Sequence, residues 1–429
     1  MNVRMNDCSI KKIIKIPDFS FEKKLTEFSF FYIGLMTGLL IFRNFFKPLG
    51  MLYNLCMAFL AARSFWLCLK DKATLTIWPF RFKLLALCLS LTFSLCFSIE
   101  FFTRNLVALT SQFLMCFIFL KMPTHNEIKS FIKGFKIVLA INYIFATVQL
   151  IIIKLYGINI FFYLGFYLGI YDSIDLAEVE VSRITGLIWD PYVLGMFCAI
   201  GFFLFKKNWT KFWILVLLYF SYSRAGEVGF VAGFCYWILP RLKRIFKSDF
   251  LALPFALLLC IPFFSFLPKA LDAMDFNRGF SRDSQGWRRV EYITKVPEVW
   301  AEDNNPFLAI FGGAPFYSGA RYLFSPVDSL IKTDVQRKAG GDEEKLFYWT
   351  VETDWFAILI GRGIFGLFAY LSLFFYIFKM KISRTNKAIA MAVFIAGVGY
   401  YYDSAIFSCF MVYFCACTKS IEESLRLSN

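Results

Sequence analysis

Charged residues are scarce in this chain, at 18% against roughly a quarter in an average soluble domain. Hydrophobic residues make up 59%, where a soluble domain carries roughly 45–50%, and the mean hydropathy is +0.59. This composition excludes a disordered protein and argues against a soluble enzyme, because so much apolar surface must face something other than water.

Histidine is nearly absent, since His125 is the single example among 429 residues. The sequence also contains no Gly-rich phosphate loop followed by Lys and Ser or Thr, and no His-Glu-x-x-His zinc motif. A Ser-His-Asp catalytic triad is not expected either, because it needs a histidine. The motifs of common soluble enzymes are therefore not found, and any mechanism distant from His125 must work without an imidazole.

Cysteine is present in twelve copies but in no pattern that binds a metal. Nearly all lie inside apolar runs, where a thiol behaves as a small hydrophobic group. Cys415 and Cys417 have no second cysteine pair and no histidine nearby, so a zinc site is not expected there. None lies in 268–350, so no disulfide framework is predicted for that segment. We expect neither a metal nor another cofactor.

The net charge of +15 has two possible explanations, a nucleic-acid-binding surface or loops that flank a membrane. The spacing decides between them, because lysine and arginine recur in short clusters that separate long apolar runs. These clusters lie at 70–83, 121–136, 206–211, 241–247 and 379–387. This is the positive-inside pattern of a protein that crosses the membrane several times, so no nucleic acid partner is expected.

Apolar stretches recur along the chain, and most are long enough to cross about 30 Å of hydrocarbon as helices. They lie at 28–46, 49–69, 84–101, 105–120, 135–155, 187–205, 211–223, 226–239, 250–267, 354–378, 387–401 and 404–418. The sequence therefore predicts an all-α fold, a polytopic transmembrane helical bundle of about 12 helices. One large extracytoplasmic loop is expected between helices 9 and 10.

The topology follows from the start of the chain, which carries several lysines and no small-residue cleavage site. The N-terminus is therefore expected to stay in the cytoplasm, which places the lysine and arginine clusters and the C-terminus on the same side. The predicted parts are a cytoplasmic segment 1–27, helices 1–9 at 28–267, a periplasmic loop domain 268–350, helices 10–12 at 351–418 and a cytoplasmic tail 419–429.

One apolar run, from 211 to 239, is interrupted near its middle by the polar segment 221–227. This segment contains Arg224 and Glu227, and an unpaired charge deep in lipid costs several kcal/mol. We therefore predict two short helices joined by a polar turn.

Ionisable residues at the predicted outer ends of the helices are the candidates for chemistry. Arg183 precedes an apolar helix, and Arg224 lies in the predicted polar turn. Glu352 and Asp354 stand where the large loop returns to the membrane. In the predicted topology all of these positions fall on the outer face, so cations and a carboxylate are expected to meet in one cavity.

The large loop contains a segment, 286–302, in which charged residues recur at spacings of three and four. This pattern predicts an amphipathic helix. Arg288 falls on its solvated face and Arg289 on its apolar face, so Arg289 is the arginine expected to point toward the membrane domain. Pro297 is expected to kink or end this helix. A Gly/Pro turn is predicted at 306–315.

These residues also have structural interpretations. An arginine at a membrane boundary often extends to lipid headgroups, and an acidic residue at a helix start often caps it. Arg63 and Arg362 are expected to be structural or lipid-facing, since nothing else singles them out. His125 is expected to be a solvated residue in a polar loop on the cytoplasmic face.

At these positions the chain resembles the O-antigen polymerase and O-antigen ligase superfamily of bacterial envelope enzymes. The predicted helix count and the single large loop between the ninth and tenth helices also match that family. The motifs that carry the resemblance are Arg183-Ile-Thr-Gly with Asp190-Pro191, Ser223-Arg-Ala-Gly, Arg288 and Arg289 followed by the turn at 306–313, and Glu352 before a helix with Gly361, Gly363 and Gly366.

The resemblance implies a multi-pass enzyme of the bacterial inner membrane that uses undecaprenyl-pyrophosphate-linked oligosaccharides on the periplasmic face, without a metal. It also implies membrane lipids, a chain-length regulator and a flippase as partners. The family's ligases carry a histidine near the end of the large loop. Here Glu352 occupies the corresponding helix head, and this departure favours a polymerase over a ligase.

The chemistry of such a reaction fits these residue types. A polyprenyl-pyrophosphate leaving group carries negative charge, which guanidinium groups stabilise bidentately without a metal. The acceptor hydroxyl needs a general base, and partial burial raises the pKa of a carboxylate at the membrane boundary. Glu352 is the first candidate for this base and Asp354 the second. The candidates for binding the pyrophosphate are Arg183, Arg224, Arg288 and Arg289.

Two other functions are alternatives. Within the same fold, an O-antigen ligase would transfer the glycan to a sugar of the lipid A core. From another class, a transporter such as a lipid-linked oligosaccharide flippase would place charged groups or broken helices near the bilayer midplane. In this chain the polar clusters fall at one predicted boundary, which favours the enzyme.

Overall fold

The structure is a computed structural model whose described residues form eleven helices. Within these residues there is no strand, so the predicted all-α fold class is confirmed for the described part of the chain. Apart from short pieces between 85 and 93, the described residues are 19–39, 47–70, 113–115, 117–120, 123–157, 159, 183–188, 191–260, 306–312, 354–380 and 382–399.

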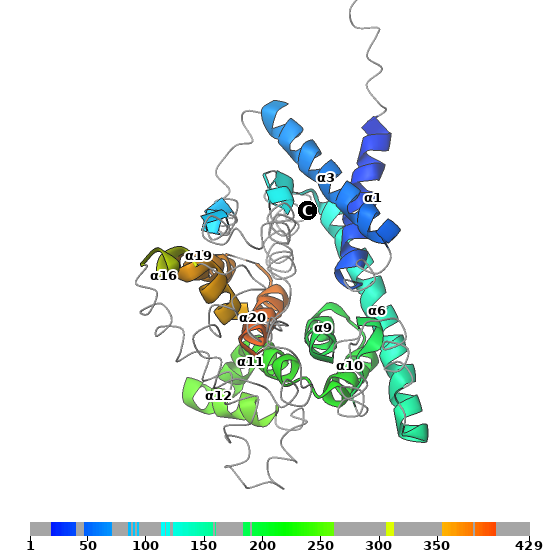
Figure 1. The fold of residues 1–429 in the computed structure, drawn as a ribbon. Helices are drawn as coiled ribbons and strands as arrows, with labels where there is room; N and C mark the ends of the chain where they lie inside the picture. The colour runs from blue at the N-terminus through cyan, green and yellow to red at the C-terminus, as the bar shows by residue number, and fades with distance from the viewer. Residues whose placement is uncertain are drawn as a thin grey trace, which may run out of the picture.

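The helices correspond closely to most of the apolar runs in these ranges (Figure 1). In chain order they are α1 (Phe19–Thr37), α3 (Lys47–Lys70), α6 (His125–Tyr156), η3 (Gly186–Ile188), α9 (Pro191–Leu204), α10 (Asn208–Ser221), α11 (Arg224–Phe246), α12 (Asp249–Leu258), α16 (Pro306–Phe311), α19 (Asp354–Lys379) and α20 (Arg384–Gly399).

Three of these helices are long and apolar enough to cross a membrane: α3, α6 and the part of α19 from Arg362 to Lys379. Each presents large apolar side chains outward, and Trp66, Leu155 and Phe368 are between 66% and 70% exposed. Exposing such surfaces to water is unfavourable, whereas contact with lipid tails is not. The helices therefore agree with the composition in indicating a membrane protein, and the full count of about twelve spans stays a prediction.

Helix α6 begins earlier than the apolar run at 135–155 predicts. Its first residue is His125, and the Thr124 amide donates a hydrogen bond of 2.8 Å to the Glu127 side chain, as in a capping box. At the other end, Gly157 adopts the left-handed conformation with φ 67° and closes the helix. The prediction that His125 lies in a polar loop is therefore wrong, because the local capping signal extends the helix through the basic segment.

The polar turn predicted inside 211–239 is confirmed. Helix α10 ends at Ser221, Tyr222 adopts a left-handed conformation with φ 49°, and α11 begins at Arg224. Ser223 caps α11, since its hydroxyl accepts a hydrogen bond of 3.1 Å from the Gly226 amide. Glu227 was expected in the turn, but it lies within the first turns of α11 and is fully buried.

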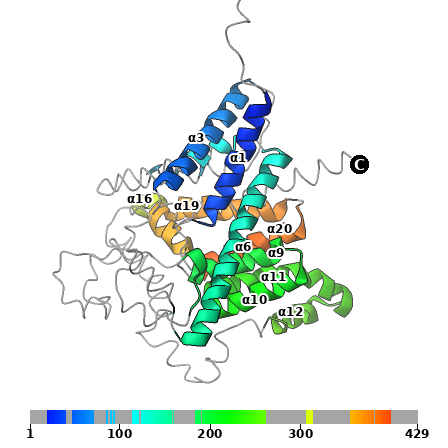
Figure 2. The ribbon, with the colours of Figure 1, turned by 90° about the vertical axis from the view of Figure 1, so that its right-hand side faces the viewer.

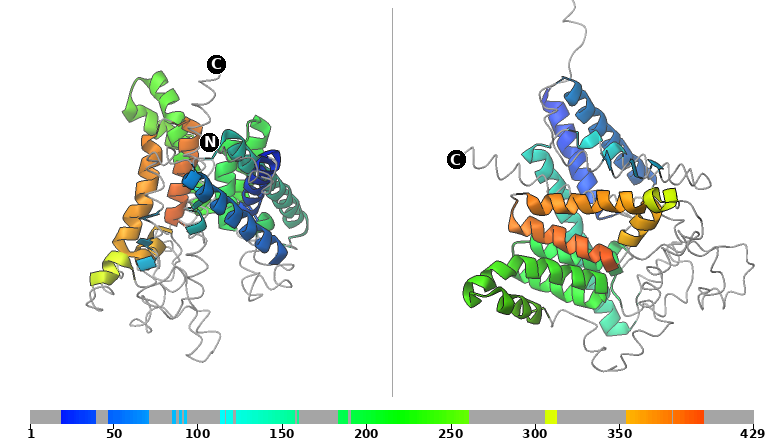
Figure 3. Two further views of the ribbon diagram at one scale, coloured as in Figure 1. Left: turned by 90° about the horizontal axis from the view of Figure 1, so that it is seen from above. Right: turned by 90° about the vertical axis from the view of Figure 1, so that its left-hand side faces the viewer.

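The helices pack as two groups joined by α6. In one group α1 lies between α3 and α6, and in the other α11 contacts α9, α12 and α20. Figure 2 shows α6 extending from α1 and α3 at one end to α10 at the other. Seen from above in Figure 3 (left), α19 lies on the opposite side of the molecule from α1 and α3.

The described part of the large loop packs on α19. A turn was predicted from Pro306 onward, but Pro306–Phe311 forms α16, and the chain turns only at Gly312, where φ is 73°. α16 lies against the point where α19 is interrupted by Gly363, with φ 64° and ψ −172°. A side chain at Gly363 would collide with the backbone of Ile310, so glycine is required both for the kink and for this contact.

The described cysteines behave as small hydrophobic side chains. All five are free and buried, which agrees with their position in apolar runs. In one pair, the Sγ atoms of Cys235 in α11 and Cys260 after α12 are 3.9 Å apart. The five are Cys56, Cys68, Cys198, Cys235 and Cys260.

Candidate functional site

Two buried carboxamides in α6 organise the segment that contains Arg183. The first is Gln149, whose Oε1 accepts hydrogen bonds from the backbone amides of Thr185 at 2.8 Å and Gly186 at 3.0 Å. Its Nε2 donates to Asn159 Oδ1 at 2.8 Å, and Asn159 Nδ2 donates to the carbonyl of Arg183 at 3.1 Å. Gln149 thus holds the irregular residues before η3, and the first residue of η3, against α6.

The second carboxamide is Asn142, about two turns earlier on the same face of α6. Its Oδ1 accepts a hydrogen bond of 3.1 Å from the Leu187 amide, and its Nδ2 donates to the carbonyl of Gly38 at 3.3 Å. Irregular backbone is tolerated inside a membrane protein only where protein groups satisfy its hydrogen bonds. Asn142 and Gln149 supply such bonds to Thr185 and to η3, a helix of three residues that is too short to satisfy its own amides.

Arg183 lies at the start of this stretch and stacks on α9. Its guanidinium carbon is 5.5 Å from the centre of the Tyr192 ring, and Nη1 lies 3.4 Å from the Tyr192 hydroxyl. The arginine remains partly exposed. Its charge is therefore oriented by an aromatic side chain while it keeps access to a ligand.

The residue before Arg224, the cap Ser223, contacts the same tyrosine. The Ser223 hydroxyl, which caps α11, is also within 3.3 Å of the Tyr192 carbonyl oxygen and donates to it. The two helices approach closely here, since a side chain at Gly226 would collide with the backbone of Gly195. Arg224 is the next residue after Ser223 and is exposed, so its backbone lies near the start of α9.

A third cation joins this end of the molecule. The Lys154 ammonium lies 4.9 Å from the centre of the Phe220 ring, and the Phe220 carbonyl accepts a hydrogen bond of 3.4 Å from the Ile184 amide. We call Lys154, Arg183, Arg224 and Tyr192 the cationic turn cluster. Lys154 was not among the predicted site residues, because a single lysine near the end of an apolar run resembles an ordinary membrane-flanking charge.

The other predicted site residues are not placed in this cluster. Arg288, Arg289 and Glu352 lie outside the described residues, and so does the helix predicted at 286–302. Asp354 is the first residue of α19, as its position at a helix head suggested. The structure thus brings Arg183 and Arg224 to one end of the α9–α11 pair, while the approach of a carboxylate stays a prediction.

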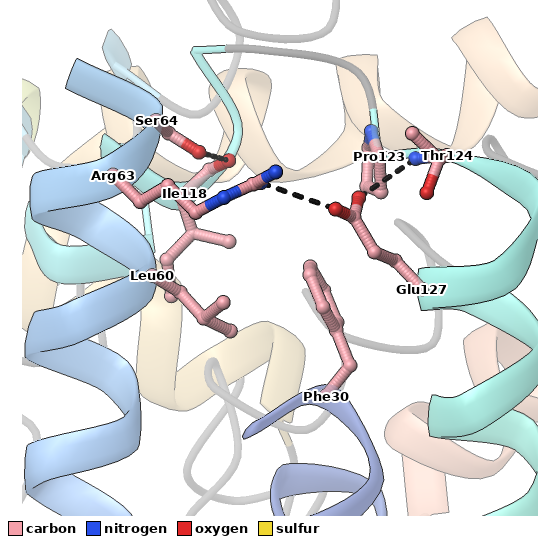
Figure 4. Close-up of a pocket in the computed structure, with 8 residues that line it drawn as sticks. All are labelled: Phe30, Leu60, Arg63, Ser64, Ile118, Pro123, Thr124 and Glu127. Carbon is pink, nitrogen blue, oxygen red and sulfur yellow. Dashed lines mark hydrogen bonds and ion pairs between the residues drawn. The ribbon is translucent and has the colours of Figure 1, made fainter. Parts of the chain in front are cut away.

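A second charged cluster lies at the opposite end of α6, and sequence reasoning identified none of its contacts. Arg63 in α3 donates from Nε to Glu22 in α1 at 2.9 Å and from Nη1 to Glu127 in α6 at 3.1 Å. Figure 4 shows Arg63 and Glu127 joined by this contact, and both line a small cavity of about 30 Å³. The structural interpretation of Arg63 is confirmed, since its charge is paired between helices and does not face lipid.

Replacing Gln149 with leucine is expected to lower the free energy of unfolding by about 2 kcal/mol, because the amides of Thr185 and Gly186 would be buried without acceptors. The change is also expected to speed proteolysis near residue 183. Thermal unfolding in detergent and limited proteolysis measure the two effects. The control is Thr147→Val, on the same helix as Gln149, which removes the hydroxyl that accepts from Trp213 of α10 and should leave the cleavage rate near 183 unchanged. An unchanged rate in Gln149→Leu would contradict the proposed anchor.

The described part of the molecule is thus an all-helical protein with candidate membrane-spanning helices and charged clusters at both ends of α6. Among these residues there is no group of three or more His, Cys, Asp or Glu side chains arranged to hold a metal ion. No protein-family model matches the chain, and no curated protein matches it in sequence.

Proposed function

We propose that this protein is a glycan polymerase of the bacterial inner membrane. It transfers a growing glycan from one undecaprenyl-pyrophosphate carrier to the non-reducing end of another lipid-linked repeat unit. The observation that carries the proposal is the position of two arginines at the same end of the α9–α11 pair, because Arg183 stacks on Tyr192 and Arg224 follows Ser223, which contacts the Tyr192 carbonyl. Two guanidinium groups at one helix boundary suit the binding of a pyrophosphate.

The direction of the helices supports a membrane topology with alternating spans. Arg63, near the end of α3, contacts Glu22 and Glu127, which lie near the starts of α1 and α6. Helices α1 and α6 therefore run in one direction and α3 in the other, as the first, fifth and second spans of the proposed order would. The basic start of α6 fits the cytoplasmic side, which puts Lys154 and the cationic turn cluster on the periplasmic side, with both chain termini in the cytoplasm in the proposed twelve-span arrangement.

The reaction needs two kinds of group. As the bond from the anomeric carbon to the pyrophosphate breaks, negative charge grows on the leaving oxygen, and Arg183 and Arg224 stabilise it. As the new glycosidic bond forms, a base removes the proton of the acceptor hydroxyl, and we assign this role to Glu352, with Asp354 as the second candidate. Arg288 or Arg289 would add a further contact to the donor from the large loop.

The proposal is tested by polymerisation in liposomes, with lipid-linked repeat units extracted from cells that lack the gene. Arg183→Ala, Arg224→Ala and Glu352→Gln are each expected to slow chain growth at least about tenfold and to shorten the product. Arg244→Ala is the matched control, since Arg244 is an exposed arginine at the other end of α11. Wild-type chain lengths from all three site variants would refute the assignment of the site.

The phenotype of cells lacking the gene distinguishes the polymerase from the ligase and the flippase. Loss of a polymerase leaves a single repeat unit attached to the lipopolysaccharide core. Loss of a ligase leaves bare core and polymer still attached to its lipid carrier. Loss of a flippase leaves single repeat units on the cytoplasmic side.

A further inference from the structure

A groove of about 650 Å³ runs along the first half of α6 and belongs to neither charged cluster. One part of its wall is basic and the other apolar, and the apolar part includes Phe205, which follows α9. The basic residues recur at every third or fourth position, so they form one row along the helix. The basic wall consists of His125, Lys129, Lys133 and Lys136, and the apolar wall of Ile132, Ile137, Ala140 and Phe205.

The positive charge of this groove is not neutralised by acidic residues that the structure describes. The two ion pairs found in that part of the chain are both made by Arg63, and the acidic residue of the same helix end, Glu127, is used in one of them. Lys206 is the residue after Phe205, which lines the groove, so it adds a further cation near this surface. Lysines this close together repel one another, and a bound anion would relieve that repulsion.

The lining of the groove changes from basic to apolar along the axis of α6. His125 and Lys129 lie at the basic start of α6, whereas Ile137 and Ala140 lie further into the apolar span. An anion bound near the start would therefore have an apolar wall directly behind it, on the side where the bilayer interior lies. An amphipathic molecule with an anionic head and a hydrocarbon tail matches both parts, while a free phosphate would match only the first.

We propose that this groove binds an anionic glycerophospholipid from the cytoplasmic leaflet. The phosphate contacts Lys129, Lys133 and Lys136, and an acyl chain lies against Ile137, Ala140 and Phe205. Lys206 adds to the positive field. This site is distinct from the cationic turn cluster, which lies at the opposite end of α6, and it rests on the proposed topology only in requiring that α6 spans the membrane with its basic start on the cytoplasmic side.

Retention of lipid by the full-length protein tests the proposal. The protein is purified in detergent, supplied with phosphatidylglycerol or phosphatidylcholine, and analysed by native mass spectrometry. The wild type is expected to retain phosphatidylglycerol in preference to phosphatidylcholine. The groove variant, with Lys129, Lys133 and Lys136 each changed to glutamine, is expected to bind phosphatidylglycerol about tenfold more weakly or worse.

A matched control removes the same charge from exposed positions at the same end of the helices. In this variant Lys23 and Lys24 of α1 and Lys70 of α3 are changed to glutamine, and lipid retention should not change. Equal losses in both variants would overturn the proposal, because the effect would then reflect net charge alone. Size-exclusion chromatography and thermal unfolding confirm that both variants are folded before they are compared.

A second variant tests the apolar wall without changing the charge. Ala140→Trp fills the groove with a bulky side chain, and it is expected to displace the acyl chain and weaken phosphatidylglycerol binding. If the lysine row instead held a free phosphate, Ala140→Trp would leave binding unchanged and millimolar inorganic phosphate would displace the lipid. Either of those outcomes, or equal retention of phosphatidylcholine by the wild type, would exclude the lipid site.

Discussion

Replacing Arg63 with methionine is expected to lower the free energy of unfolding by about 3 kcal/mol. The side chain of Arg63 is the cation between Glu22 and Glu127, and the Glu127 side chain is only 8% exposed. Removal of the guanidinium group would leave the Glu127 carboxylate buried without its partner, although its hydrogen bond from the Thr124 amide would remain. The cost comes mainly from this uncompensated charge, because methionine fills a similar volume.

The measurement is thermal or denaturant unfolding of the detergent-solubilised protein. The double variant Arg63→Met with Glu127→Gln removes both charges and keeps an oxygen that accepts from Thr124, so it should recover most of the lost stability. Arg244→Met is the single-site control, since it removes an exposed arginine and should change the free energy by less than about 0.5 kcal/mol. A double variant no more stable than Arg63→Met would show that packing, and not the unpaired charge, causes the loss.

The second large effect is expected where α1 crosses α6. A side chain at Gly34 would collide with the carbonyl oxygen of Phe131, and a side chain at Gly134 would collide with that of Phe31. Both obstacles are backbone atoms, so neither can rotate away. Gly134→Val is therefore expected to force the two helices apart and to destabilise the protein by about 3 kcal/mol or more.

This prediction is checked by unfolding in the same detergent and by the retention of α1 after cleavage of the chain between α1 and α3. Val148→Ile adds one methylene group to α6 at an exposed, outward-facing position and should behave as the wild type. Wild-type stability of Gly134→Val, with α1 still bound after cleavage, would contradict the close helix crossing.

The helices themselves were largely predictable from local sequence. The apolar run at 49–69 forms α3. The polar segment 221–227 predicted the break between α10 and α11, because an ionised side chain is unfavourable in hydrocarbon. Pro191 also begins α9 as its preference for the first helical position suggests. The start of α6 and the helix α16 were missed, because basic residues and a Pro/Gly-rich composition suggested loops where capping and packing on α19 produce helices.

The site was predictable only in part, since its contacts join residues that are distant in sequence. Arg183 and Arg224 were recognisable as charges at predicted helix ends. The role of Gln149 was not, because its partners lie in a segment far along the chain and nothing in an apolar helix indicates which polar group faces inward. The ion pairs of Arg63 were not predictable for the same reason, as its two carboxylates come from different helices.

The hydrogen bonds of α6 also imply an order of events during biosynthesis. The backbone partners of Gln149 are 36 and 37 residues further along the chain, so the ribosome delivers them after α6 is complete. A carboxamide that enters the bilayer without a partner is unfavourable. Until Thr185 has been synthesised, the most favourable places for α6 are at the translocon or beside α1, where Asn142 already donates to the carbonyl of Gly38. The final integration of α6 is therefore coupled to the synthesis of the segment that follows it.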